Sequence, residues 1–334
     1  MITEGIIPFQ QIIGALLDAE TPFPPQYLHS LSDLDKEELV LLAGSWSEIP
    51  TWRKHALMED IEELGIKDTI LSFEEFGLFT VRDPDPKVRL LSVHILCEYD
   101  DTRLADLFIE LLGSDEDAEV RAAAAIGLGR FVLYGELDRI SEGRHREIEE
   151  HLLQAARTGE TPFERQRALE ALGYSSRVEV APIIENAYNS DDSGWVVSAL
   201  YAMGHSANER WQPMVLDMLD NINAAIRSAA VYAAGELEIG SARASLVELL
   251  EDADEDIRLN SIWALSQIGG EGIRDILEEL HAQTDDHTEL ERIVEALDHL
   301  EFWAGLGSMP LLDVSEDDES EFYSIHYEDE EGWD

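Results

Sequence analysis

His94 and Cys97 are the two side chains whose types and spacing most readily suggest catalysis. Cys97 is the single cysteine of the chain, and a histidine three residues before it would share its face of a helix. An imidazole there could take the proton of the thiol and create a nucleophile. Single cysteines are, however, commonly buried and unreactive, so we expect Cys97 to be inert. One cysteine also excludes an internal disulfide, which suits a reducing cytoplasm.

The histidines show no spacing typical of a metal site. None of the ten is followed by Glu, no two stand four residues apart, and there is no cysteine pair for zinc. Gly127 and Gly129 belong to a recurring Ala-Leu-Gly position and not to a phosphate-binding loop. The sequence therefore predicts a protein that is not an enzyme and that binds neither a cofactor nor a metal.

Three large aromatic side chains, Tyr201, Tyr232 and Trp263, recur at an interval of 31 residues. Tyrosine and tryptophan dominate the energetics of many protein–protein interfaces, so a row of them could anchor an extended or helical peptide. The alternative is that the rings pack against one another between repeats and cover the core. Aromatic side chains at helical spacing more often have this second role, and the sequence leaves both interpretations open.

The charge of the chain restricts its partners. Asp and Glu number 72 against 23 Lys and Arg, for a formal net charge of −49. Such a field repels nucleic-acid phosphate and anionic lipid, so we expect no nucleic acid and no membrane as partner. The N-terminus lacks the basic start of a signal peptide, and no apolar run approaches the ~20 residues of a membrane helix. We expect a cytoplasmic protein that binds a basic or amphipathic protein segment. Salt adaptation is an alternative origin of the acidity.

An internal repeat sets the positions of these residues. Each copy reads acidic turn, Val or Ile, usually Arg, small residues and then Ala-Leu-Gly. The Val/Ile position falls at Val88, Val120, Glu164, Trp195, Ile226, Ile257 and Glu289, with a weaker earlier copy at Trp52. The intervals between the seven clear copies are 31 or 32 residues, except for one of 44. A second amphipathic stretch precedes each copy, so the predicted unit is helix A, turn and helix B.

This repeat resembles the HEAT family, specifically the bacterial HEAT-like type named after phycobilisome lyases, and the whole chain resembles bacterial HEAT proteins with acidic tails. The resemblance implies an all-α, right-handed α-α superhelix, a HEAT/armadillo-like solenoid of about eight helix pairs that acts as a non-catalytic protein-interaction scaffold or adaptor. The family name leaves open an alternative function as a chromophore lyase-like enzyme or chaperone.

In the HEAT family, an Asp in the turn and an Arg early in helix B form a ladder along the array. Three pairs keep the six-residue offset of that motif here: Asp83/Arg89, Asp115/Arg121 and Asp252/Arg258. Asn221/Arg227 keeps the offset with a neutral Asn in place of the Asp, and Arg165 has no Asp six residues before it. Val196 and Leu290 stand in the Arg position, so we expect the ladder to be broken there.

Helix B should line the concave surface, as it does in HEAT arrays. When helix B is counted from its Val/Ile position as zero, offsets 0, 4, 7, 8 and 11 share one face, which should be core. Offsets 3, 6 and 10 form the opposite arc and should face the groove. The candidate partner-binding residues on this arc are Arg167, Tyr174, Tyr201, His205, Tyr232, Trp263 and Gln267.

The chain divides into three predicted parts. Residues 1–34 should form an N-terminal helical cap, and residues 35–303 should form the solenoid. Residues 304–334 should form an acidic disordered tail, because residues 313–334 hold eleven Asp or Glu and no Lys or Arg. The interval of 44 predicts an insertion near residues 131–147. Its three arginines could hold an acidic segment, unless the helices simply run longer there; they are Arg139, Arg144 and Arg146.

Overall fold

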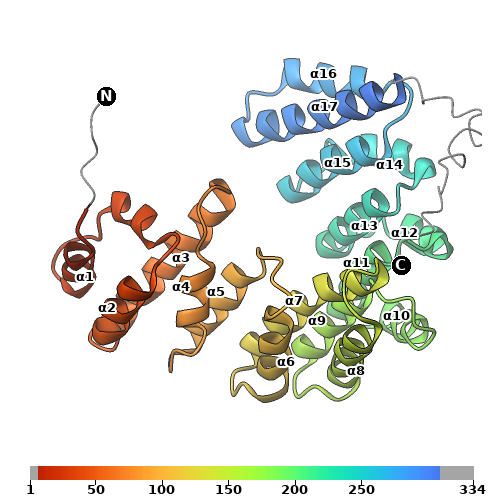
Figure 1. Ribbon diagram of the computed structural model, residues 1–334. Helices are drawn as coiled ribbons and strands as arrows, with labels where there is room; N and C mark the ends of the chain where they lie inside the picture. Colours follow the sequence, from red (N-terminus) through yellow and green to blue (C-terminus); the bar gives the residue numbers. More distant parts are fainter. Residues whose placement is uncertain (1–6, 309–334) are drawn as a thin grey trace, which may run out of the picture.

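The computed structural model describes the backbone of residues 7–308 and the side chains of residues 7–303, so residues 1–6 and most of the predicted tail, 309–334, lie outside it. Within the described range all regular structure is helical (Figure 1). A short helix α1, Phe9–Leu17, and a 3-10 helix, Pro25–Leu31, precede eight helix pairs. The predicted all-α solenoid of about eight pairs is confirmed.

The helices keep the order A then B throughout. Helices A are α2 (Lys36–Trp46), α4 (Glu74–Thr80), α6 (Leu104–Ser114), α8 (Glu142–Thr158), α10 (Val180–Tyr188), α12 (Gln212–Asp217), α14 (Arg243–Leu249) and α16 (Ile273–Gln283). Helices B are α3 (Thr51–Lys67), α5 (Pro86–Leu96), α7 (Ala118–Glu136), α9 (Pro162–Leu172), α11 (Ser193–His205), α13 (Ala224–Glu236), α15 (Glu255–Ile268) and α17 (His287–Ser308). Because α17 continues to Ser308, helix extends past the predicted start of the tail.

Short polar side chains in the turns start helices B. Asp85 before α5 and Asp117 before α7 each accept hydrogen bonds from two backbone N–H groups of the first helical turn. The same role belongs to Thr161, Asp192, Asn223 and Asp254 before the next four helices B. Each such cap stabilises a helix by about 1 kcal/mol. The recurring turn therefore fixes where these six helices B begin, whereas α3 follows Pro50, which makes no side-chain cap.

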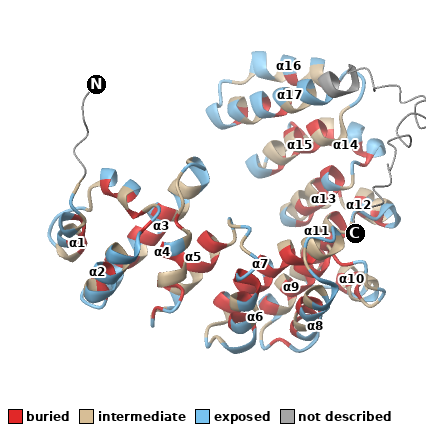
Figure 2. Ribbon diagram, viewed as in Figure 1, coloured by how far each residue is buried: buried red, intermediate tan, exposed pale blue. Residues whose placement is uncertain are grey.

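Helices B form the inner layer of a curved array, and helices A form the outer layer (Figure 1). Successive helices B contact one another without a break from α3 to α17, whereas helices A are farther apart, with α6 and α8 the closest of them. In a curved stack the more closely spaced layer is the concave one. Helices B therefore line the concave surface, as expected, and the buried residues gather between the layers (Figure 2).

The glycine of the Ala-Leu-Gly position lets successive helices B approach to backbone contact. A Cβ added at Gly173 would lie 2.6 Å from the carbonyl oxygen of Ala202. A Cβ at the equivalent Gly235 would lie 2.5 Å from a ring carbon of Trp263. Side chains larger than hydrogen would push these helices apart, so this glycine controls the spacing of the concave layer.

The residues before the first pair complete the first of two hydrophobic cores. Ile12, Leu16 and Leu31 are fully buried and belong to the core that extends to Ile95. The second core extends over the remaining helix pairs. The segment thus packs against the first repeats, and its role as an N-terminal cap with a boundary at residue 34 stays a prediction.

The region of the 44-residue interval consists of long helices. Helix α7 has 19 residues and α8 has 17, and residues 137–141 join them. The arginines there already have partners: Arg144 pairs with Asp106 and with a carboxylate on its own helix, and Arg146 pairs with Glu142. The guanidinium of Arg139 lies over the ring of Tyr134. This basic segment is therefore largely neutralised by the chain itself.

Candidate partner-binding groove

The ladder ties neighbouring repeats together at the N-terminal ends of helices B. The Arg89 guanidinium donates to both carboxylate oxygens of Asp115 in the next turn, at 2.8 and 2.7 Å. It also donates to the carbonyl oxygen of Asp83 in its own turn, at 3.0 Å. Lys54 makes the preceding rung with Asp83, over 2.7 Å. The arginine therefore contacts the backbone carbonyl of the Asp six residues before it. Its ion pair is with the Asp of the following repeat.

Two rungs use glutamates that the sequence analysis overlooked. Arg121 donates to Glu164, and Arg258 donates to Glu289, at 3.0 and 2.6 Å. Both glutamates occupy the Val/Ile position of helix B and are buried. The sequence does contain a sign of these two rungs, since a glutamate stands where other repeats have Val or Ile. A carboxylate buried at such a position needs a partner. The array is therefore tied at the last repeat too, although Leu290 stands in the Arg position there.

The ladder is missing in the middle of the array. Arg165 donates to the carbonyl oxygen of Gly159, its own turn, at 3.2 Å. The next turn carries Ser190 where Asp115 stands in its repeat, and Val196 replaces the arginine. Within the described part of the chain, no ion pair joins α9 to α11 or α11 to α13. The ladder resumes with Arg227, which donates to Asp252 at 2.8 and 3.0 Å.

The predicted aromatic residues come together across this middle region. The Tyr174 and His205 rings stack with centroids 4.3 Å apart, and His205 meets Tyr232 edge-on at 5.9 Å. Tyr232 in turn stacks on Trp263 at 5.3 Å and contacts Tyr201 at 5.1 Å. All five side chains are half-buried. The rings therefore do pack between repeats, and they leave part of their surface on the concave side; we call these five the aromatic row.

The other two candidate residues do not join the row. Arg167 pairs with Glu170 over 2.6 Å, and its guanidinium lies over the ring of Phe163. The amide of Gln267 donates to Ser266 on its own helix. Both side chains thus have local partners, and their role as partner-binding residues stays a prediction.

Burial shifts the ionisable groups around the row toward their neutral forms. It raises the pKa of Glu170 and of Glu236, and it raises the pKa of the Tyr232 hydroxyl. It lowers the pKa of His205. The Nδ1 of His205 lies 3.0 Å from the Glu170 carbonyl oxygen, and its Nε2 lies 3.3 Å from the Tyr232 hydroxyl. A neutral imidazole that donates from Nδ1 and accepts at Nε2 satisfies both contacts.

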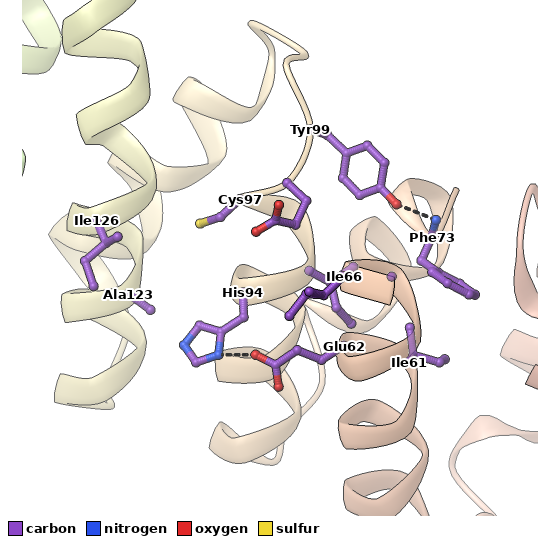
Figure 3. Close-up of a pocket in the computed structure, with 12 residues that line it drawn as sticks. Ile61, Glu62, Ile66, Phe73, His94, Cys97, Tyr99, Ala123 and Ile126 are labelled. Atoms are coloured by element: carbon purple, nitrogen blue, oxygen red, sulfur yellow. Dashed lines mark hydrogen bonds and ion pairs between the residues drawn. The ribbon is translucent and has the colours of Figure 1, made fainter. Parts of the chain in front are cut away.

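A pocket of about 250 Å³ opens on the concave side of α3, α5 and α7 (Figure 3). Ile126 on α7 faces His94 and Cys97 on α5 across it, and Ile66 and Glu62 come from α3. Ile66 is 67% exposed and Ile126 is 48% exposed. The spacing of His94 and Cys97 had drawn attention to α5, but Ile66 and Glu62 could not be expected beside them, because the repeat that holds α3 carries only a weak form of the motif.

A second pocket, of about 380 Å³, shares Cys97, Glu98 and Ile126 with the first. It continues over α7 and α9 to Tyr174 and His205, where the aromatic row begins. The two pockets and the aromatic row thus form one continuous surface on helices B from α3 to α15. We call this surface the concave groove.

The geometry of His94 and Cys97 is unsuited to nucleophilic catalysis. Burial raises the pKa of the Cys97 thiol to about 12, so the thiol stays protonated near neutral pH. The imidazole of His94 turns to Glu62, with Nδ1 at 2.8 Å from a carboxylate oxygen (Figure 3). A base engaged in this way cannot also activate the sulfur from that nitrogen. The two residues therefore serve as lining of the first pocket.

None of the helices in the described range is both long enough and apolar enough to cross a membrane.

Two regions of the chain match a known protein family. Residues 76–141 and 212–298 match the family described as HEAT repeats. Curated proteins give no match. The solved complex of CpcE and CpcF of phycocyanin lyase from Nostoc sp. PCC7120 is 17% identical, with a TM-score of 0.46, and the match covers 68% of this chain and 94% of that one.

Two further solved structures are similar in the same way. E. coli YibA is 18% identical with a TM-score of 0.40, over 72% of this chain and 96% of that one. Human deoxyhypusine hydroxylase, solved with glycerol, is 17% identical with a TM-score of 0.37, over 88% of this chain and 96% of that one. Likeness at this level concerns the type of fold and not the activity. The more specific finding is the family match, in which residues 76–141 and 212–298 resemble HEAT repeats.

Proposed function

We propose that the protein is a non-catalytic scaffold or adaptor whose concave groove binds a basic, amphipathic segment of another protein. The observation that carries the proposal is the continuity of the groove, in which two pockets sharing three residues lead into the aromatic row. Pockets of about 250 and 380 Å³ are large enough to receive individual apolar side chains. Exposed isoleucines at the first pocket offer apolar contact to such side chains.

The charges of the groove favour a basic partner. Glu62 and Glu98 border the pockets, and Glu236 lies beside the aromatic row. Arg130, a basic side chain that lines the second pocket, is paired with Asp100 at 3.2 Å. His94 already engages Glu62, and burial favours the neutral form of Glu236. Glu98, which lines both pockets, is therefore the carboxylate that a lysine or arginine beside the apolar face of a segment would meet. Such attraction increases the association rate and weakens as salt is added.

Affinity capture with matched variants tests this proposal. Ile126→Asp places a charge in both pockets, whereas Ile222→Asp makes the same change at a 98% exposed turn residue outside the groove. Wild-type protein and Ile222→Asp should recover the same partner from native lysate, and Ile126→Asp should lose it. High salt should release the partner. Equal recovery by Ile126→Asp, or a partner without a basic segment, would contradict the proposal.

The alternative of a chromophore lyase-like enzyme or chaperone stays a prediction of the sequence resemblance. Mixing the purified protein with a bilin and recording the visible absorbance checks it directly. A stoichiometric change in the bilin spectrum would favour this alternative over the scaffold.

A further inference from the structure

Three ligand-type side chains meet where α7 turns into α8, just past Leu133, which lines the second pocket of the groove. Glu136 lies at the end of α7, and His145 and Glu149 lie one turn apart on α8. The Nε2 of His145 is 3.8 Å from a Glu136 oxygen and 3.5 Å from a Glu149 oxygen. One ligand atom from each of the three lies within 4.8 Å of the other two.

The imidazole nitrogen at the centre of this cluster has no hydrogen-bond partner within the described structure. His145 Nε2 is fully buried, and both carboxylate oxygens are too distant or poorly aligned to bond it. The side chain of His145 is 14% exposed and that of Glu149 is 4% exposed. A buried polar atom without a partner is costly, so its position between two carboxylates calls for a reason.

The surrounding residues hold the cluster in this arrangement. A Cβ at Gly135 would lie 2.1 Å from Cγ of His145, so only glycine lets the imidazole lie against α7. The backbone N–H of Ser176 donates to Glu136 at 2.8 Å, and the hydroxyl of Ser175 donates to Glu149. Such outer contacts orient metal-binding side chains in proteins. They come from the segment between α9 and α10, so three parts of the chain converge here.

We propose that Glu136, His145 and Glu149 bind one divalent transition-metal ion such as Zn²⁺. Zinc takes nitrogen and carboxylate ligands at about 2.0–2.2 Å in a tetrahedron, which places neighbouring ligand atoms roughly 3.4 Å apart. The observed separations of 3.5 and 3.8 Å approach that value with little movement. An imidazole ligand disfavours Mg²⁺ and Ca²⁺, which prefer oxygen.

The ion would act as a clamp at the irregular interval of the array. Glu136 is 25% exposed, so solvent can supply a fourth ligand and the metal can enter from that side. Bound there, the metal joins the end of α7 to α8 and, through Ser175 and Ser176, to the segment after α9. This site is separate from the proposed groove function and does not depend on it.

Cobalt and zinc titrations of the untagged full-length protein test the site. Excess Mg²⁺ occupies the many surface carboxylates, and Co²⁺ then reports imidazole and carboxylate ligation through its visible absorption. Wild-type protein should take up a single equivalent of Co²⁺ that Zn²⁺ displaces, and Zn²⁺ should raise its unfolding temperature. His145→Gln and Glu136→Gln should each weaken binding by about tenfold or more. Glu136→Gln keeps an acceptor for the Ser176 N–H.

His151→Gln is the matched control, because it removes a second histidine of α8 that lies outside the cluster. This variant should bind Co²⁺ as wild-type protein does. Circular dichroism confirms that each variant is folded before it is titrated. The proposal is overturned if wild-type protein binds no Co²⁺ in excess Mg²⁺, or if folded His145→Gln binds it as tightly as wild-type protein.

Discussion

The outer parts of the array and its middle hold their helices B together in different ways. From α3 to α9 and from α13 to α17, buried ion pairs connect each turn to the next. Between α9 and α13 those pairs are replaced by glycine-mediated backbone contact and by the stacked rings of the aromatic row. The two regions matched by the HEAT family flank this middle, with residues 142–211 unmatched between them.

The difference shows that the same arrangement of helices B can be stabilised either by ion pairs at the turns or by contacts on the concave face. Ion pairs at the turns leave the concave face free to form pockets, as along α3–α9. Where the ion pairs are lost, ring contacts on the concave face join the helices, and the aromatic row continues to Trp263 on α15, where the ladder has resumed. The ladder and the family match do not coincide, because Lys54 of α3 and Glu164 of α9 make ladder pairs outside the matched residues.

The largest effect should come from removing a buried ladder carboxylate. Asp83 accepts from Lys54 and from the Trp46 indole N–H, and its side chain is 1% exposed. Asp83→Ala leaves the Lys54 ammonium buried without its partner, which should reduce the free energy of unfolding by about 3–5 kcal/mol. Urea unfolding measures this change.

Asp191→Ala is the control for that measurement. Asp191 is exposed and lies in a turn of the ladder-free middle. Its removal should change the free energy of unfolding by less than about 0.5 kcal/mol. Equal losses for both variants would contradict a special role for the ladder.

Glycine substitution should distinguish the close-packed middle from the outer layer. Gly173→Ala pushes a methyl group into the backbone of Ala202 and should destabilise the protein by about 1–3 kcal/mol. Gly113 of α6 has nothing within 4 Å of an added Cβ, so Gly113→Ala should stabilise by about 0.5–1 kcal/mol. Thermal unfolding of both variants compares them, and a stabilising Gly173→Ala would rule out the close approach.

Installing the missing acceptor should extend the ladder into the middle. Ser190 stands 25 residues after Arg165, the same separation as Asp252 from Arg227. The Ser190 hydroxyl already accepts from the Asp192 N–H, as the Asp252 carboxylate does from Asp254. Ser190→Asp should therefore pair with Arg165 and raise the free energy of unfolding by about 1 kcal/mol. If Arg165→Gln does not abolish the gain, the rung has not formed.

The smallest effect should be a pH dependence that originates in the aromatic row. Burial lowers the pKa of His205 below its ordinary value of 6.5, so the folded protein binds fewer protons there than the unfolded chain. Stability is then lost as pH falls below 6.5. The raised pKa values of Glu170 and Glu236 act in the opposite direction at lower pH. Wild-type protein should lose stability relative to His205→Gln on acidification, and parallel curves would exclude this origin.

The sequence predicts the array because its period and its small residues are local and repeated. The helix wheel alone places the seven candidate residues on the concave arc of helices B, and their role in binding stays a prediction. The ring contacts do not follow from the wheel, because they depend on how far one helix B is rotated and shifted against the next. Glu164 and Glu289 complete rungs from an apolar position, which the consensus pattern hides.

The α3 side of the first pocket and the Glu136–His145–Glu149 cluster could not be predicted from the sequence. Ile66 and Glu62 reach the groove from α3, whose repeat is degenerate. Glu136 meets His145 because residues 137–141 turn the chain back between the end of α7 and the start of α8. Spacing rules within one helix cannot reveal ligands that come from two.

Photo-crosslinking from position 126 tests most directly whether the concave groove is the surface that binds a partner. A photoreactive amino acid replaces Ile126 in the groove or, as control, Ile222 on the exposed turn, and the crosslinked peptides are mapped after irradiation in native lysate. If the concave groove binds the partner, position 126 should crosslink to a segment rich in lysine or arginine and apolar residues, and position 222 should give no crosslink. A partner crosslinked equally from both positions, or from position 222 alone, would show that the concave groove is not the binding surface.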